Sequence, residues 1–149
     1  MKKLLILFLI AFSFANSKGQ WNPIPGPYLE SNYVGMSFFN NILINNGLLY
    51  ANIERRVYLS YNKGESWMKA SGTDGIQVSR IACFDSFIYK GTPGGGLYYS
   101  DNYGSTYNHA KNNIPEDAYI TTLFANNSII LAANQLDKVY YSTDNGYNW

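Results

Sequence analysis

Short β-favouring segments alternate with polar turns along most of this chain. From residue 33 onward, runs of four to seven residues rich in Val, Ile, Leu, Tyr and Phe are separated by clusters of Gly, Asn, Asp and Ser. Strands of this length, with a turn about every 8 to 12 residues, favour an antiparallel meander. After the N-terminal apolar run, no segment keeps a helical periodicity over about 11 residues. The pattern therefore predicts an all-β protein.

The same order of four strands is predicted three times. First strands are expected at 33–39, 78–84 and 119–124. Short turns follow at 45–47, 85–86 and 126–128. Second strands are expected at 48–51, 87–90 and 129–132, and third strands at 57–59, 97–99 and 139–141. A fourth strand, which carries an aromatic residue, then closes each unit.

The units are tied together by an octapeptide with the pattern Ser-x-Asn/Asp-x-Gly-x-x-aromatic. It occurs at 60–67, 100–107 and 142–149, so that successive copies start 40 and 42 residues apart. This spacing divides the chain into repeats at 21–66, 67–106 and 107–148. Four strands per unit of roughly 40 residues are typical of a β-propeller blade. Since propellers have about 4 to 8 blades, three predict an incomplete ring. We therefore expect further blades beyond Trp149, with closure between chains as the alternative.

Every defined position of the octapeptide has a reason in folding. The glycines suit a hairpin turn that needs positive φ. The Asn or Asp and the Ser supply short side chains that bond nearby backbone groups. The aromatic ring is expected to be buried between adjacent sheets. The residues with these structural roles are Ser60, Asn62, Gly64, Trp67, Ser100, Asn102, Gly104, Tyr107, Ser142, Asp144, Gly146 and Trp149.

Residues 1–17 have the form of a secretory signal peptide. Lys2 and Lys3 precede an apolar run at 4–14, and small residues follow at Ala15 and Ser17. The run is shorter than the roughly 20 residues of a membrane-spanning helix, so cleavage after Ser17 is expected. The sequence thus predicts a secreted or cell-surface protein with a mature part at 18–149 and no stable transmembrane span.

Composition excludes several classes of function. The whole chain has 11 basic and 10 acidic residues, and Arg55-Arg56 is its only basic pair outside the leader, which argues against a nucleic-acid partner. The one cysteine, Cys83, lies in an apolar stretch and is read as a core residue. With His109 as the only histidine, no metal site and no cofactor are predicted.

The octapeptide resembles the Asp-box, or BNR, repeat, whose pattern is Ser/Thr-x-Asp-x-Gly-x-Thr-Trp/Phe. The third copy fits best, whereas Asn62 and Asn102 stand where the family prefers Asp, and Tyr107 replaces its Trp or Phe. The resemblance covers the chain from Trp21 onward. It implies a β-propeller like those of sialidases, xyloglucan-degrading hydrolases, sortilin-type receptors and the photosystem II assembly factor. It also implies that the box is a structural turn away from the ligand face.

Two enzymatic readings remain open. A sialidase-like site requires an arginine cluster, and Arg80-Ile81-Ala82 lacks the proline of the corresponding Arg-Ile-Pro motif. A xyloglucanase-like site requires two acids across a cleft, and Asp74 and Glu116-Asp117 fall in loops before first strands. Polar turn residues are common in such loops. His109 has no nucleophile that can be placed beside it, and a position on the surface of an outer strand is expected.

The sequence therefore predicts a secreted Asp-box β-propeller that acts as a non-catalytic binding or scaffold module for glycans or proteins. The ligand is expected on the face formed by the first strands and their loops, near Asp74, Arg80 and Asp117. A glycoside hydrolase with its catalytic residues largely in further blades is one alternative. A protein receptor or an assembly factor is the other.

Overall fold

Three antiparallel β-sheets follow one another along the chain in the computed structural model, which describes residues 26–27, 39–71 and 75–149. The first sheet is formed by β1 (Phe39–Asn45), β2 (Leu48–Ile53), β3 (Arg56–Ser60) and β4 (Met68–Lys69). The second is formed by β5 (Arg80–Phe84), β6 (Phe87–Gly91), β7 (Leu97–Ser100) and β8 (Asn108–His109). The third contains β9 (Ile120–Ala125), β10 (Ile130–Asn134) and β11 (Val139–Ser142).

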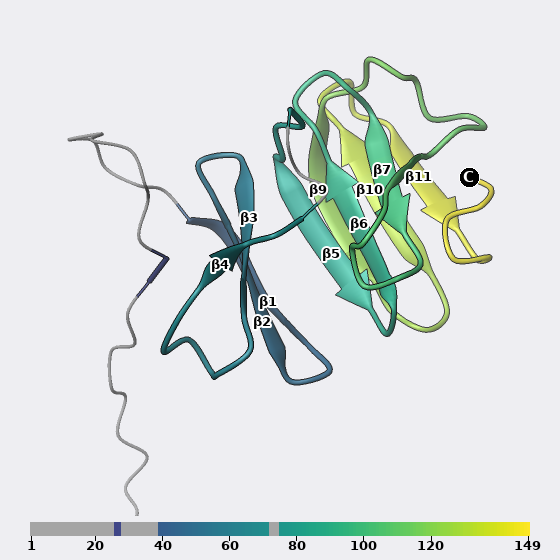
Figure 1. The fold of residues 1–149 in the computed structure, drawn as a ribbon. Helices are drawn as coiled ribbons and strands as arrows, with labels where there is room; N and C mark the ends of the chain where they lie inside the picture. The colour runs from purple at the N-terminus through teal and green to yellow at the C-terminus, as the bar shows by residue number, and fades with distance from the viewer. Residues whose placement is uncertain (1–25, 28–38, 72–74) are drawn as a thin grey trace, which may run out of the picture.

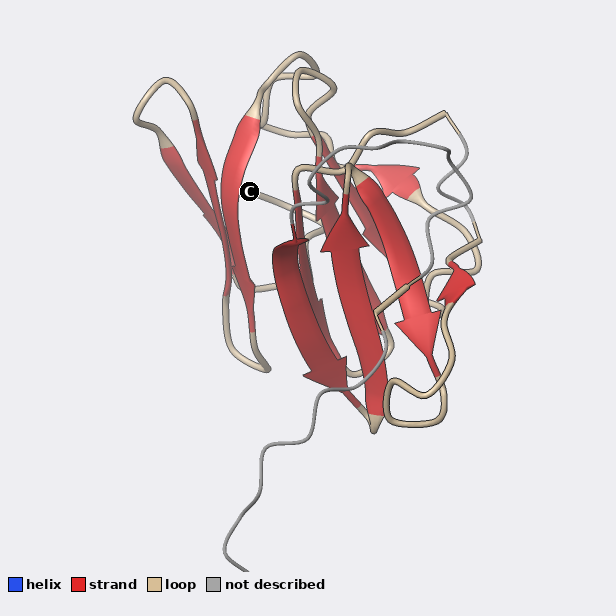
Figure 2. Ribbon diagram, turned by 90° about the vertical axis from the view of Figure 1, so that its left-hand side faces the viewer, coloured by secondary structure: helices blue, strands red, loops and turns tan. Residues whose placement is uncertain are grey.

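In each sheet, strands that are consecutive in the chain are neighbours, so each sheet is a meander. The sheets stack in the order of the sequence, with β1 against β5 and β5 against β9 (Figure 1). The described residues contain strands and loops but no helix (Figure 2). The predicted all-β class, with four-stranded sheets in an incomplete ring, is confirmed. The predicted signal peptide at 1–17 lies outside the described residues.

The first strand of the first sheet lies later in the chain than predicted. Apart from Phe39, the predicted segment 33–39 lies outside the described residues, and β1 runs Phe39–Asn45 up to the turn. Asparagines made this segment look unlike a strand. Their amides are used between sheets, because Asn41 Nδ2 donates to the Ile81 carbonyl at 2.8 Å and Asn45 Nδ2 to that of Asp85 at 2.7 Å. The neighbouring sheet thus accepts hydrogen bonds from the two amide NH₂ groups, whose burial without a partner would disfavour this strand.

The prediction that the fourth strand carries the aromatic residue of the octapeptide is wrong by one position. Trp67 and Tyr107 each come one residue before β4 and β8. The outer strand pairs with the third strand through Leu59↔Met68 in the first sheet and Tyr99↔Asn108 in the second. Each of these two sheets therefore takes its outermost strand from the start of the next sequence repeat.

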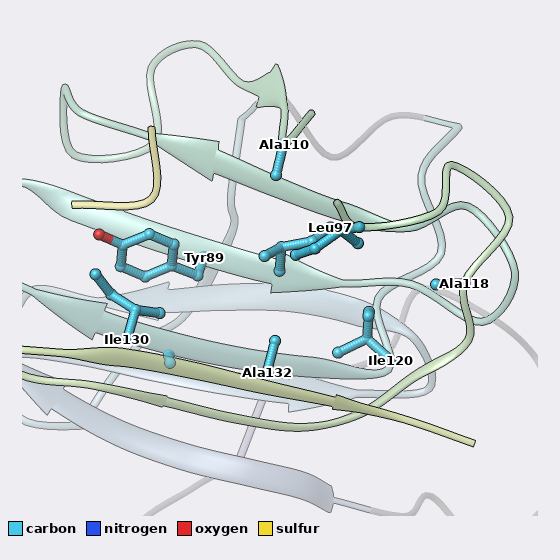
Figure 3. Packing of buried hydrophobic residues seen from close by; sticks show 9 residues of the cluster. Tyr89, Leu97, Ala110, Ala118, Ile120, Ile130 and Ala132 are labelled. Carbon is cyan, nitrogen blue, oxygen red and sulfur yellow. The ribbon is translucent and has the colours of Figure 1, made fainter. Parts of the chain in front are cut away.

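Two apolar cores lie between the sheets. Between the first and second sheets, the buried residues include Tyr50, Val57, Leu59, Ile81 and Ile88. Between the second and third sheets, Tyr89 and Leu97 meet Ile120 and Ile130 (Figure 3). Burial of each such aliphatic side chain stabilises the folded state by about 1.5–3 kcal/mol. Packing of sheet against sheet, rather than pairing within a sheet, holds the three sheets together.

One face of the third sheet is uncovered in the described part of the chain. Val139 and Tyr141 are 69% and 62% exposed. The residues equivalent to Val139 in the other two sheets are Val57 and Leu97. They are 1% and 0% exposed, because the next sheet covers them. The third sheet therefore repeats the pattern that the other two use to receive a neighbour, which agrees with an incomplete ring.

Candidate functional site

The loops of all three sheets divide between two ends. In a meander, the connections between first and second strands and between third and fourth strands share one end. The octapeptide turns therefore lie at one end of each sheet. The connections between second and third strands, and those leading to the next first strand, lie at the other. We call the latter end the loop face, and it includes the Glu54–Arg55 turn and the loops at 92–96 and 110–119.

The octapeptide turn has the same hydrogen bonds in all three copies. In the first, Ser60 Oγ accepts from the Gly64 N–H at 2.8 Å and donates to Asn62 Oδ1 at 3.0 Å, and Asn62 Oδ1 accepts from the Ser66 N–H at 2.9 Å. The corresponding Gly N–H distances are 2.9 Å to Ser100 and 2.8 Å to Ser142. The glycines Gly64, Gly104 and Gly146 have φ values of 93°, 85° and 86°.

The second polar atom of the Asn or Asp side chain, Nδ2 or Oδ2, is hydrogen-bonded to the side chain at the seventh position of the octapeptide. Asn62 Nδ2 donates to Ser66 Oγ at 2.9 Å, and Asn102 Nδ2 donates to Thr106 Oγ1 at 2.8 Å. In the third copy the direction is reversed, because Asn148 Nδ2 donates to Asp144 Oδ2 at 2.7 Å. The hydrogen bonds from Asn148 hold the pKa of Asp144 below its ordinary value. Asn therefore replaces Asp without loss of a bond, and the Ser and the Asn or Asp that define the octapeptide are used in folding.

At the opposite end, a chain of hollows crosses the loop face of the first and second sheets. The hollows next to Arg80 and next to Arg56 have volumes of about 280 and 330 Å³ and share Glu54 and Arg55. A third, of about 290 Å³, continues from residues 75–77 to the loop at 92–95. We call the first two the loop-face groove; they are lined by Asn40, Glu54, Arg55, Arg56, Lys69, Gly75, Ile76, Gln77, Ser79, Arg80 and Tyr119.

The loop-face groove is predominantly cationic. Arg55, Arg56, Lys69 and Arg80 line it, and Glu54 is the only carboxylate among its described residues. Two of the guanidinium groups are held in place. Arg80 Nη1 donates to the Ser79 carbonyl at 2.7 Å, and Arg55 Nη1 donates to Gln77 Oε1. Guanidinium groups fixed in this way suit the planar oxygens of carboxylate or phosphate groups.

The Glu54–Arg55 turn that enters the groove has a costly backbone. Ile53 pairs with Arg56, so these two residues alone connect β2 to β3. Both have positive φ, 48° at Glu54 and 65° at Arg55, where Gly, Asn or Asp is usual. Each such residue costs on the order of 1–3 kcal/mol. The chain keeps a strained turn at the point where it places Arg55 beside Gln77, and strain of this kind clusters at functional sites.

The structure places the candidate residues of the sequence in different surroundings. Arg80 is the first residue of β5 and lines the groove. Asp117 is exposed on the loop before β9 and does not line it, and neither does Glu116. Asp74 lies outside the described residues.

Sequence reasoning missed Arg55, Gln77 and Tyr119. The signal that could have revealed the first was a two-residue turn between two strands with neither Gly nor Asn.

His109 and Cys83 are each half-buried. His109 lies on the outer strand β8, as predicted, and its ring packs edge-to-face on Tyr98 at 4.7 Å. Its Nε2 lies 3.1 Å from the Gly95 carbonyl. Cys83 is a free thiol at the edge of the first core, where burial raises its pKa to about 11. A thiol with a raised pKa is a poor nucleophile at neutral pH.

The described part of the chain offers no group of three or more His, Cys, Asp or Glu side chains placed to hold a metal ion. Within the same residues, no helix has the length and apolar character needed to cross a membrane.

Solved structures of several proteins resemble this one. YCF48 from Cyanidioschyzon merolae superposes with a TM-score of 0.62 at 13% identity, over 76% of this chain and 36% of that one. Human WBSCR16 gives 0.54 at 12%, over 75% and 34%. A GH74 enzyme from Niastella koreensis gives 0.55 at 19%, over 68% and 17%. No protein-family model and no curated protein sequence matches the chain.

These neighbours are β-propeller proteins, so the chain has the fold that its repeats predict. At such low identity the likeness concerns the fold alone. The chain spans about a third of the length of YCF48 and of WBSCR16, and less of the GH74 enzyme. The chemistry of any site must therefore come from the residues of this chain.

Proposed function

We propose that this chain is part of an exported β-propeller that binds an anionic ligand, a glycan or an acidic protein segment, in the loop-face groove without turning it over. The observation that carries the proposal is the set of cationic side chains around this groove, with Arg55 and Arg80 positioned by hydrogen bonds and Glu54 as its one described carboxylate. Fixed cations select anionic groups by charge and by paired hydrogen bonds.

The test is a calorimetric titration with two polyanions, polygalacturonate and poly-glutamate, and with neutral dextran as a reference. We expect at least one polyanion to bind and dextran not to bind in the groove. The Arg55→Gln/Arg80→Gln variant should lose most of this affinity. Lys63→Gln is the matched control, because it removes an exposed cation from the octapeptide turn at the opposite end. Equal loss in both variants, or no binding by either polyanion, would contradict the proposal.

A glycoside hydrolase is the second candidate, and the structural likeness to a GH74 enzyme favours it. Glycoside hydrolysis generally needs a pair of carboxyl groups across the bound sugar. Glu54 is one acid in a suitable place, and Asp74 is the candidate for its partner by sequence. Release of reducing ends from xyloglucan, abolished by Glu54→Gln, would establish this reading in place of the first.

A role as a receptor or assembly factor would use the same face for a protein. It predicts that a partner protein co-purifies with the wild type and is lost in Arg55→Gln/Arg80→Gln. Export is proposed on the form of residues 1–17 alone. N-terminal sequencing of the mature protein from the culture medium or cell surface tests it, and a start at Lys18 is expected.

A further inference from the structure

A further hollow lies at the periphery of the second and third sheets, on elements that the loop-face groove does not use. It has a volume of about 470 Å³. We call it the tyrosine hollow; it is lined by Tyr99, Tyr107, Asn108, His109, Lys111 and Tyr147. This size falls in the range of small-molecule sites, and a lining of aromatic rings with a few polar groups is typical of them.

Tyr147 is the residue of the hollow that the octapeptide turn does not require. It occupies the sixth position of the third octapeptide, where the first and second copies have Glu65 and Ser105. The hydrogen bonds of the turn use the first, third, fifth and seventh positions and leave the sixth side chain free. Tyr147 is nevertheless a large ring that is 47% exposed. An exposed aromatic side chain at a position that is polar in the other copies points to contact with a ligand.

The ring of Tyr147 is held rigidly. It packs edge-to-face on Tyr99, with centroids 5.6 Å apart and planes at 82°, and on Phe87, at 6.4 Å and 87°. Its backbone N–H donates to the Asp144 carbonyl at 3.3 Å. The two tyrosines therefore present fixed ring surfaces from two different sheets, so little side-chain freedom is lost when a ligand binds.

Amide and cationic side chains surround these rings. Asn108 pairs with Tyr99 in the strand register and so lies on the same face of the second sheet. Lys111 follows on the loop after β8. This loop is tied to the third octapeptide, because Asn112 Nδ2 donates to Asn148 Oδ1 at 3.2 Å and Asn113 Nδ2 donates to the Trp149 carbonyl at 2.6 Å. An exposed amide side chain can both donate and accept hydrogen bonds, so it can bind a ligand that carries several hydroxyl groups.

We propose that the tyrosine hollow binds a short neutral oligosaccharide, with a sugar ring stacking on Tyr147, Tyr99 contacting the edge of that sugar, and Asn108 and Lys111 bonding its hydroxyl groups. A sugar ring has an apolar C–H face and a polar edge, which matches flat aromatic surfaces bordered by amides. A folded protein partner fits less well, because a stable protein interface buries about 800 Å² on each side rather than filling one small hollow.

The test uses the full chain, with cellohexaose, maltohexaose and chitohexaose as probes. Binding is followed by calorimetry and by changes in backbone amide resonances. We expect at least one probe to bind and to shift the resonances of residues 99, 108, 111 and 147. Tyr147→Ser, which restores the residue type of the second copy, should weaken binding at least tenfold, while Tyr147→Phe should keep it.

Two further variants separate binding from folding and from the loop-face groove. Asn108→Ala removes an exposed amide outside the cores and should also weaken binding, whatever Tyr147→Ser does to stability. Tyr61→Thr, an exposed tyrosine of the first octapeptide, and Arg55→Gln/Arg80→Gln should bind as the wild type does. Absence of binding by all three probes, or unchanged affinity in both Tyr147→Ser and Asn108→Ala, would overturn the proposal while leaving the loop-face groove untouched.

Discussion

The Lys90 amino group lies over the face of the Tyr107 ring, 3.1 Å from its centroid, in the interior between the first and second sheets. Lys90 is fully buried. Its equivalents in the other two sheets are Ala51 and Ala132, by the strand register.

Those two sheets carry Trp, not Tyr, at the end of the octapeptide, and each Ala packs in the same cluster as its Trp: Ala51 with Trp67, and Ala132 with Trp149. The second sheet thus combines a long side chain with a smaller ring, where the others combine Ala with the larger one. Lys90 and Tyr107 fill one shared volume.

The first prediction is that Lys90 and Tyr107 are energetically coupled. Lys90→Ala leaves a cavity and Tyr107→Trp overfills the site, and each is expected to destabilise the protein by about 1–3 kcal/mol. Together they recreate the Ala–Trp pair of the other sheets, so the double variant should be more stable than the sum predicts, by about 0.5–3 kcal/mol. Urea denaturation of all four proteins measures the coupling. Additive effects would show that the two side chains do not share a volume.

The second prediction concerns pH. Burial lowers the pKa of Lys90 from 10.5 to about 7. Between these values the unfolded chain binds the proton that the folded chain has released. The contribution of Lys90 to stability therefore rises with pH, by up to ~1.4 kcal/mol per pH unit, and is smallest below about pH 7. In Lys90→Met this rise should disappear.

Neighbouring groups titrate with the opposite sign, so the comparison must be between the two proteins. Burial raises the pKa of Tyr50 to about 12 and that of Cys83 to about 11, and also raises that of Tyr107. The contribution of these groups to the stability of the protein falls at high pH, in wild type and variant alike. The measurement is the difference in unfolding free energy between wild type and Lys90→Met. It is followed from about pH 6 to about pH 10, a range that covers most of the interval between the two pKa values of Lys90. A difference independent of pH would mean that Lys90 is charged in the folded protein.

The third prediction concerns the second octapeptide turn. Gly104 has a φ of 85°, and a Cβ there would lie 2.7 Å from Tyr107 Oη and 3.2 Å from Ile88 Cδ1. Gly104→Val should therefore destabilise the protein by about 1–3 kcal/mol or more. Gly47 is the matched control, because its φ is 78° but nothing lies within 4 Å. Gly47→Val tests backbone strain without the clash. Equal losses of thermal stability would show that the contact with Tyr107 has no cost.

The fourth prediction concerns the close approach of the second and third sheets. A Cβ on Gly91 would lie 2.5 Å from Ile120 Cγ2. Its equivalents Asn52 and Ala133 carry side chains, so the strand itself does not require glycine. Gly91→Ala should destabilise by about 1–3 kcal/mol through overpacking. The control Ala133→Ser should stay within about 0.5–1 kcal/mol of the wild type. A wild-type melting temperature for Gly91→Ala would mean that the two sheets separate easily.

The architecture follows from the sequence because its signals are local and repeated. Three copies of one turn fix the period, and the segments between them show strand patterning. The limits have equally physical causes. Asn41 and Asn45 concealed β1, because their amides find partners only in the next sheet. The sequence places Lys90 in a second strand, and only the structure reveals that it is buried over an aromatic face.

The candidate site was predictable only in outline. The loop face and Arg80 followed from the meander, since first strands and their loops fall together. Arg55 did not, because its position depends on two consecutive left-handed residues without the usual turn chemistry. The tyrosine hollow joins Tyr99 and Tyr147, which belong to different sequence repeats. Side chains from different repeats lie together there, and the residue pattern within one repeat does not predict such a contact.

The position of the outer strand has a consequence for how this kind of chain changes in evolution. Because β4 and β8 come immediately after Trp67 and Tyr107, the junction between sequence repeats falls inside a sheet. A genetic exchange that joins the Trp67 codon to the codon following Tyr107 would delete one repeat. It would give β3 the strand of β8 in place of β4, and these two strands pair in the same register. The first sheet would keep four strands and the third would be unchanged, so a repeat can be gained or lost at this junction without costing the first sheet its outer strand.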